Sequence, residues 1–163
     1  MRYHKIRKTD ISNGPGIRVS IFMQGCTFHC KNCFNQETWD FNGGKEFNDE
    51  TIKMVLELCD NDYITGLSIL GGEPLHPNNI DGTMKLAKAF KEKYPSKSLW
   101  IWSGFTFDKL EDKEIIKYID VLVDGRYQDE LHDFRLKWRG SSNQRVIDVK
   151  KTLKREEIVL YDE

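Results

Sequence analysis

The stretch Gly25-Cys26-Thr27-Phe28-His29-Cys30-Lys31-Asn32-Cys33-Phe34 places three of the chain's four cysteines on one short segment. Their spacing is C-x3-C-x2-C, and the remaining cysteine, Cys59, is remote in sequence. Three thiolates on one loop can bind three irons of a cubic iron–sulfur cluster and leave the fourth iron without a protein ligand. An open metal position is what a catalytic site needs and a structural site avoids. The spacing therefore predicts a catalytic cluster bound by Cys26, Cys30 and Cys33.

Other uses of these cysteines fit the pattern less well. A structural zinc site takes four ligands, usually from two separated pairs, whereas a Cys3His site that includes His29 would have every ligand on one tight loop. A ferredoxin needs four cysteines per cluster. Cys59 lies on the apolar stripe of a helix expected to start near Asn48, so we predict a small buried side chain there. A zinc-binding structural or adaptor module stays the minor alternative.

Length and composition limit the class of protein. A chain of 163 residues predicts one domain, spanning residues 1–163. Its net charge of −1 gives no overall field toward nucleic acid or anionic lipid. No apolar run is long enough to span a bilayer, and no apolar segment typical of a secretory signal follows the basic N-terminus. Clustered thiols that must stay reduced favour a cytoplasmic protein with no membrane partner.

One segment departs from the even charge balance. Residues 137–155 carry seven basic side chains against one acidic side chain. A basic face can bind nucleic acid, and such binding would be strongly salt-dependent. That hypothesis leaves the cysteine triad unexplained, and acidic residues follow at positions 156, 157, 162 and 163. We therefore expect a solvated segment and no nucleic-acid partner.

Alternating strand and helix patterns surround the cysteine loop. Strands are predicted over residues 18–23, 66–70, 99–102, 120–124 and 146–149, and helices over residues 48–59, 80–94 and 106–119. Residues 1–16 read as irregular or weakly extended. This alternation predicts an α/β fold with a parallel sheet. The chain is too short for a full eightfold barrel, so we expect a partial, open (β/α) barrel.

Candidate ligand-binding residues recur where the predicted strands end. Gly71, Gly72 and Glu73 follow one strand, Ser103 follows the next, and Asp124 ends the strand after it. Two glycines let a ligand approach bare backbone, and Glu73 can accept hydrogen bonds from an ammonium group. Each of these segments, taken alone, is also typical of an ordinary turn into a helix. Since ligands bind at the carboxyl ends of parallel strands, their coincidence with the cysteine loop predicts one composite site.

Together these motifs resemble the radical S-adenosylmethionine (SAM) superfamily and, within it, the activating proteins of anaerobic (class III) ribonucleotide reductase. The resemblance runs nearly end to end and covers Asn13–Arg18, the cysteine triad, Gly71–Leu75, Asp120–Tyr127 and Gly140–Arg145. The last segment matches a signature that generic radical SAM enzymes lack. Two positions depart from the pattern. Glu73 stands where the family often has Asp, and Asn32 stands where many radical SAM proteins have an aromatic residue.

The resemblance implies a particular chemistry. The triad would bind a 4Fe–4S cluster, SAM would occupy the open iron, and Gly71 to Glu73 would hold the amino group of SAM. Adenine contacts would come from Asn32 to Phe34, and we add Ser103 and Asp124 as candidate cofactor contacts. Reductive cleavage of SAM would generate a radical that takes hydrogen from a glycine Cα of the reductase and leaves a glycyl radical. This chemistry needs no protein general base, so we predict no catalytic side chain.

The resemblance also implies the partners. These are the large subunit of the anaerobic reductase as protein substrate, a low-potential electron donor such as a flavodoxin, and a second copy of the chain in a homodimer. The main alternative is a radical SAM enzyme that acts on a small molecule. Only an activating protein would produce a glycyl radical when incubated with SAM and the reductase. The zinc alternative predicts a colourless protein that contains zinc and no sulfide.

Overall fold

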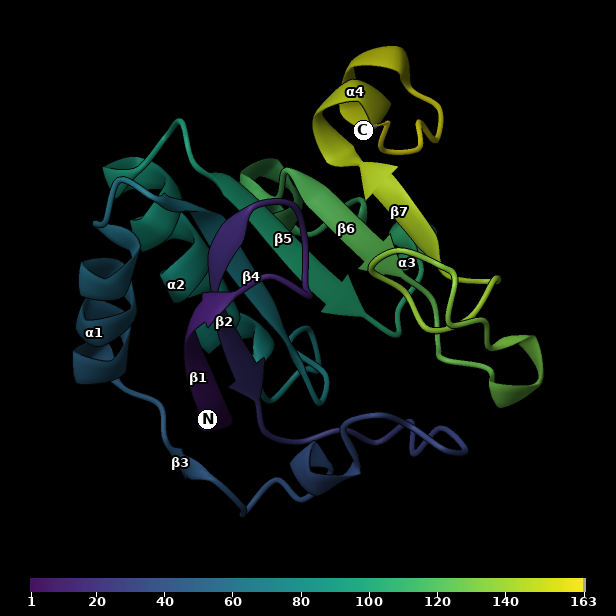
Figure 1. Cartoon of the computed structure of the whole chain (residues 1–163), viewed down its shortest axis with the longest axis horizontal. Helices are drawn as coiled ribbons and strands as arrows, with labels where there is room; N and C mark the ends of the chain where they lie inside the picture. The colour runs from purple at the N-terminus through teal and green to yellow at the C-terminus, as the bar shows by residue number, and fades with distance from the viewer. Residues whose placement is uncertain (163) are drawn as a thin grey trace.

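A computed structural model describes residues 1–162 of the chain (Figure 1). Within these residues the strands form one seven-stranded sheet in the order β3-β1-β2-β4-β5-β6-β7. The strands are β1 (Arg2–Asp10), β2 (Ile17–Met23), β3 (Lys45–Glu46), β4 (Ile64–Gly71), β5 (Ser98–Ser103), β6 (Val121–Asp124) and β7 (Arg145–Asp148). The α-helices are α1 (Asp49–Cys59), α2 (Ile80–Lys93), α3 (Phe107–Leu110) and α4 (Val149–Arg155). Short 3-10 helices are η1 (Gln36–Thr38), η2 (Glu114–Tyr118) and η3 (Asp129–Leu131).

The centre of the sheet is parallel and its edges are antiparallel. Strands β2, β4, β5 and β6 pair in parallel, so their carboxyl ends meet at one edge. β1 pairs antiparallel with β2 and with β3, while β7 pairs antiparallel with β6 at the opposite side. The sheet is open, because β3 and β7 end the strand order without pairing to each other. The predicted α/β class and the parallel pairing of the central strands are thus confirmed, whereas the outer strands β1, β3 and β7 make the sheet mixed.

The two faces of the sheet have different roles. One face is apolar and packs against α1 and α2, with Ile21, Ile69 and Ile101 of the strands in one core with Val55 and Phe90 of the helices. A capping box fixes the start of α1, since the Asn48 side chain accepts from the Thr51 backbone and the Thr51 side chain accepts from the Asn48 backbone. The other face buries polar groups as well, including Arg18 and Ser68.

The predicted central strands and the first two helices are found within a few residues of their expected bounds. Residues 1–16 were predicted as irregular or weakly extended, yet β1 forms there by pairing with the buried strand β2. The helix predicted over residues 106–119 is wrong as one element. It divides into α3 and η2, with Lys113 in extended backbone between them. Cys59 is fully buried, as predicted. No helix in the described part of the chain is long and apolar enough to cross a membrane.

Candidate active site

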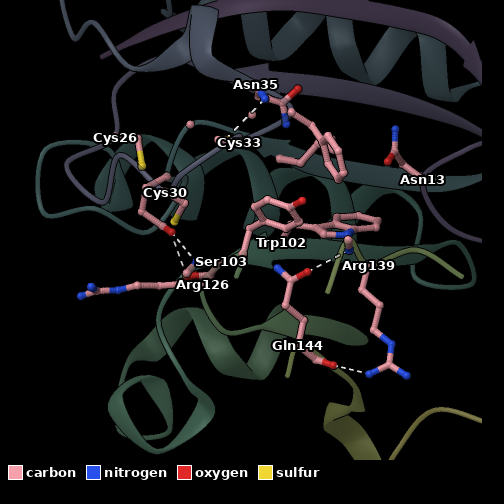
Figure 2. Close-up of a pocket in the computed structure, with 18 of the residues that line it drawn as sticks. Asn13, Cys26, Cys30, Cys33, Asn35, Trp102, Ser103, Arg126, Arg139 and Gln144 are labelled. Atoms are coloured by element: carbon pink, nitrogen blue, oxygen red, sulfur yellow. Dashed lines mark hydrogen bonds between the residues drawn. The ribbon is translucent and has the colours of Figure 1, made fainter. Parts of the chain in front are cut away.

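A cavity of about 440 Å³ lies at the edge where the parallel strands end. Its wall includes the predicted residues Cys26, Cys30, Cys33, Phe34, Gly71, Gly72, Glu73 and Ser103. Figure 2 shows the three cysteines together at one end of this cavity and Arg139 at the other. Segments far apart in sequence therefore converge on one site, as the strand-end argument predicts.

Backbone hydrogen bonds hold the cysteine loop, residues 25–34, in place. Gly25 N donates to Thr38 O at 2.6 Å, and Cys26 N donates to Trp39 O at 3.1 Å. Gly25 has a φ of +106°, and a Cβ there would lie 2.2 Å from the Phe41 ring. Only glycine fits this close approach to Phe41. The segment after the cysteines, which includes η1, therefore packs directly against the start of the cysteine loop.

The three cysteines carry free thiols that face one cavity. Cys26 is buried and the other two are half-buried. Burial raises the pKa of Cys26 and of Cys30, so a metal that binds them must displace protons. Within residues 1–162 no three His, Cys, Asp or Glu side chains are grouped to hold a single metal ion. A cubic cluster instead takes one thiolate at each of three irons, which is the donor set that this loop offers.

The Gly71–Glu73 turn lies directly against the cysteine loop. Gly71 has a φ of +111°, and a Cβ there would come within 2.5 Å of Met23 N. At Gly72 a Cβ would lie 2.6 Å from Gly25 O, and Glu73 N donates to that same oxygen at 2.8 Å. The turn has no room for side chains at these two positions, which leaves bare backbone facing the cavity.

Glu73 is the buried carboxyl of the site, with 2% of its surface exposed. Its carboxylate accepts hydrogen bonds from Leu75 N at 2.9 Å, Ser103 Oγ at 2.8 Å and Gly104 N at 2.6 Å. Burial raises its pKa to about 7 despite these donors. A ligand with an ammonium group would favour the ionised form. Because the Ser103 hydroxyl donates to the Glu73 carboxylate, it also orients that carboxylate.

Asn79 connects the two ligand-facing loops, and sequence analysis missed it. Its side-chain amide donates to Gln24 O at 3.1 Å and to Glu73 O at 3.0 Å. Gln24 immediately precedes the cysteine loop. Asn79 occupies the N-cap position of α2, yet its side chain makes no capping bond. An Asn before a helix usually indicates a cap, so the sequence contains no signal for this bridging role.

Two residues predicted to contact the cofactor, Asn32 and Asp124, do not line the cavity. The Asn32 side chain donates to Asp129 Oδ2 at 2.9 Å. The Asp124 carboxylate is 1% exposed and accepts from Arg145 and, at 2.9 Å, from Phe107 N. Asp124 reaches the correct strand end, but its oxygens bind protein groups beside the cavity rather than facing into it.

Arg126 and several aromatic side chains complete the wall. The Arg126 guanidinium lies 4.3 Å from the centre of the Phe28 ring, which belongs to the cysteine loop. The Trp102 indole donates to Trp138 O at 2.7 Å and forms part of the apolar wall with Trp39. Sequence analysis did not predict Arg126, because one Arg after a glycine turn is typical of a solvated loop.

Comparison with known proteins gives consistent matches. A family model described as a 4Fe-4S single cluster domain matches residues 12–147. Similar proteins named anaerobic ribonucleoside-triphosphate reductase-activating protein occur in several organisms. The Enterobacteria phage T4 protein is 39% identical over 90% of this chain and 93% of its own length. The Vibrio cholerae protein is 40% identical over 88% and 96%, and the Escherichia coli protein is 38% identical over 90% and 97%.

Proposed function

Because the chain belongs to the family of anaerobic ribonucleoside-triphosphate reductase-activating proteins, we propose that it generates a glycyl radical on such a reductase. The proposed reaction uses a 4Fe–4S cluster to cleave SAM reductively. One observation supports this most strongly: three free thiols, a glycine turn and the buried Glu73 carboxyl face one cavity. The family match to a 4Fe-4S domain agrees with that donor set.

We propose that Cys26, Cys30 and Cys33 bind the cluster. When bound, the cluster supplies the electron for cleavage of SAM, and the protein supplies binding, orientation and exclusion of water. Glu73 receives the ammonium group of SAM, and Gly71 and Gly72 allow its close approach. Ser103 keeps the Glu73 carboxylate turned toward the site through their hydrogen bond. No residue is required as a general base.

The walls of the cavity suit a reaction that must be kept from water. The aromatic rings of Phe28, Trp39 and Trp102 line it, so the reacting groups would contact apolar surface on part of the wall. A dry site prevents quenching of reactive species and strengthens electrostatic interactions inside it. Phe34 and Phe134, which are 60% and 87% exposed, also belong to the lining. We propose that the reductase large subunit covers this open side.

The arrangement of the sheet supports a partial barrel of the radical SAM type. Helices α1 and α2 cover one face, while Phe22, Leu70 and Trp102 of the central strands line the cavity. The cavity draws on residues from Arg7 to Gln144, which favours one domain over residues 1–163. A flavodoxin-like electron donor, a homodimer, cytoplasmic location and the absence of a nucleic-acid partner remain predictions that rest on sequence alone.

The test is an anaerobic incubation of reconstituted protein with SAM, a low-potential reductant and the purified reductase. We expect the electron paramagnetic resonance (EPR) signal of a glycyl radical on the reductase, and none with a Cys30→Ala variant. SAM cleavage without any radical on the reductase would instead support a radical SAM enzyme that acts on a small molecule. If fully reconstituted protein gives no SAM cleavage and no glycyl radical, the proposal is contradicted.

A further inference from the structure

The C-terminal signature of the sequence lies opposite the end of β6. Asp124 and Arg145 form the last pair of the antiparallel β6–β7 ladder. Arg145 Nε donates to Asp124 Oδ1 at 3.0 Å and Arg145 Nη2 donates to Asp124 Oδ2 at 2.5 Å. Because Asp124 is almost fully buried, this ion pair holds strands β6 and β7 together where their regular ladder ends.

Beyond this pair the ladder continues through side chains. Gln144 Nε2 donates to Gly125 O at 3.0 Å, and Asn143 Nδ2 donates to Arg126 O at 2.8 Å. Residues 124, 125 and 126 thus bond residues 145, 144 and 143 in antiparallel order. Gln144 is itself fixed, since its Oε1 accepts from Gly140 N at 2.8 Å and from Ser141 N at 3.1 Å. Figure 2 shows Gln144 reaching toward the cavity beside Arg139.

The segment held in this way, residues 125–129, touches the cysteine loop in three places. Arg126 stacks on Phe28 at 4.3 Å, and the Tyr127 ring centre lies 4.9 Å from that of Phe34. Asp129 then accepts from the Asn32 side chain. Gly125 has a φ of +99°, so the segment leaves β6 through a sharp turn that strand pairing alone does not hold. Its first residues are therefore held by the bonds from Asn143 and Gln144, while Gln128 N near its end donates to Ser141 Oγ at 3.1 Å.

We propose that Asn143 and Gln144 are positioning residues that act through the backbone of Gly125 and Arg126 and keep the Arg126 charge beside the cysteine loop. The inference rests on the proposed function. A cluster on three thiolates becomes more negative on reduction, and a cation beside it, such as the exposed Arg126 guanidinium on the Phe28 ring, favours the reduced state. By holding Arg126 in this position, Asn143 and Gln144 would thereby raise the reduction potential of the cluster. The signature beyond the usual radical SAM motifs gains a physical role in this way.

The key variant is Gln144→Glu. It keeps an acceptor for Gly140 N and Ser141 N but loses the donor to Gly125 O. Ser142→Ala is the matched control in the same signature, because no hydrogen bond within the described residues uses the Ser142 hydroxyl. In cluster-free protein, we expect faster hydrogen–deuterium exchange at residues 125–129 in Gln144→Glu than in wild type or Ser142→Ala.

The second readout is the midpoint potential of the reconstituted cluster, followed by EPR during redox titration. We expect Asn143→Ala and Arg126→Gln, neither of which adds a negative charge, to shift it to lower potential, and the double variant of these two to go no lower than Arg126→Gln alone. Gln144→Glu is used for the exchange measurement alone, because its added negative charge would itself lower the potential. Wild-type exchange and potential in these variants would overturn the inference. A wild-type protein that binds no cluster would instead refute the proposed function.

Discussion

At the scale of single residues, Glu73 is a buried carboxyl, and we propose that its charge binds the ammonium group of SAM. The carboxyl has a pKa of about 7 in the folded protein against an ordinary value of 4.5. Folding therefore takes up a proton between these pH values, because the unfolded chain has already released it. The free energy of unfolding should fall as the pH rises from about 4.5 to about 7, by about 3 kcal/mol, and this contribution should level off above that range.

Glu73→Gln should remove that contribution, since an amide does not titrate. Urea denaturation of the cluster-free protein between about pH 4.5 and 8 would measure it. We expect the fall in unfolding free energy across this window to be smaller in the variant by about 3 kcal/mol. Identical pH profiles for the two proteins would show that the Glu73 carboxyl is not raised in pKa by burial.

Two cysteines offer a matched comparison. Cys30 lines the cavity, whereas Cys59 is fully buried in the core, and burial raises its pKa to about 12. Cys30→Ala should lose the cluster while keeping the fold. Cys59→Ala should keep its iron and sulfide and lose about 1 kcal/mol of stability for the cavity it leaves. Metal and sulfide analysis with urea denaturation separates them, and full iron content in Cys30→Ala would refute the ligand assignment.

The residues that the sequence predicted for the site line the cavity, with the exception of Asn32 and Asp124. The cysteine spacing predicted Cys26, and the meeting of parallel strand ends at one edge predicted that Glu73 would lie near it. Asp124 occupies the expected strand end, yet Arg145 takes its carboxylate. Arg145 lies on β7, and the local sequence does not indicate that β7 pairs antiparallel with β6. Asn79 escaped detection because its bridging bonds depend on the tertiary contact of two loops.

At the scale of elements, Arg18 fixes the start of β2 to its neighbours. The side chain is fully buried, and burial lowers its pKa to about 10. Its guanidinium donates to Pro15 O in the preceding turn, to Ser68 Oγ and Leu67 O of β4, and to Ser98 O and Oγ of β5. One cation therefore ties a turn and three parallel strands together.

Arg18→Met should be strongly destabilising, because it leaves several buried acceptors without donors. We expect a loss of roughly 3 kcal/mol or more in the free energy of unfolding, measured by urea denaturation. Lys8→Met, at an exposed position of β1, is the control and should change stability by less than about 0.5 kcal/mol. A loss of similar size in both variants would show that Arg18 is not the link described.

The elements that sequence patterns predicted are those with their own apolar signal. β4 and β5 are almost continuously buried, so their residues identify them. β1 is polar over much of its length and becomes a strand by pairing with β2. α4 formed where a solvated segment was expected, because the Asp148 side chain caps it and Val149 and Thr152 are buried. Tertiary packing, not local propensity, decides these two elements.

At the scale of the whole molecule, the cavity forms only when segments from the whole fold come together. Its wall takes residues from β2, β4 and β5, the cysteine loop, the turn after β6, and the segment before β7. Because the sheet is open, hydrogen bonds between loops, such as those of Asn79 and Gln144, hold these segments together. Any group that binds across these loops should therefore stabilise the folded state over the unfolded chain.

Cluster loading should accordingly raise the thermal unfolding midpoint. We expect anaerobically reconstituted protein to unfold several degrees above the cluster-free protein, and removal of iron with a chelator to reverse the shift. Cys33→Ala, treated identically, should show little shift. Scanning calorimetry or circular dichroism under anaerobic conditions would measure the midpoints. Equal midpoints with and without a fully loaded cluster would contradict a cluster that joins the loops.

The most direct test of the central claim is EPR of the anaerobically reconstituted protein after reduction with dithionite, recorded with and without SAM. We expect the signal of a reduced 4Fe–4S cluster that changes when SAM is added, because the proposed ligands Cys26, Cys30 and Cys33 would leave one iron open to it. A cluster signal that is unchanged by SAM would contradict the open iron. A protein that binds zinc and no sulfide would contradict the cluster itself.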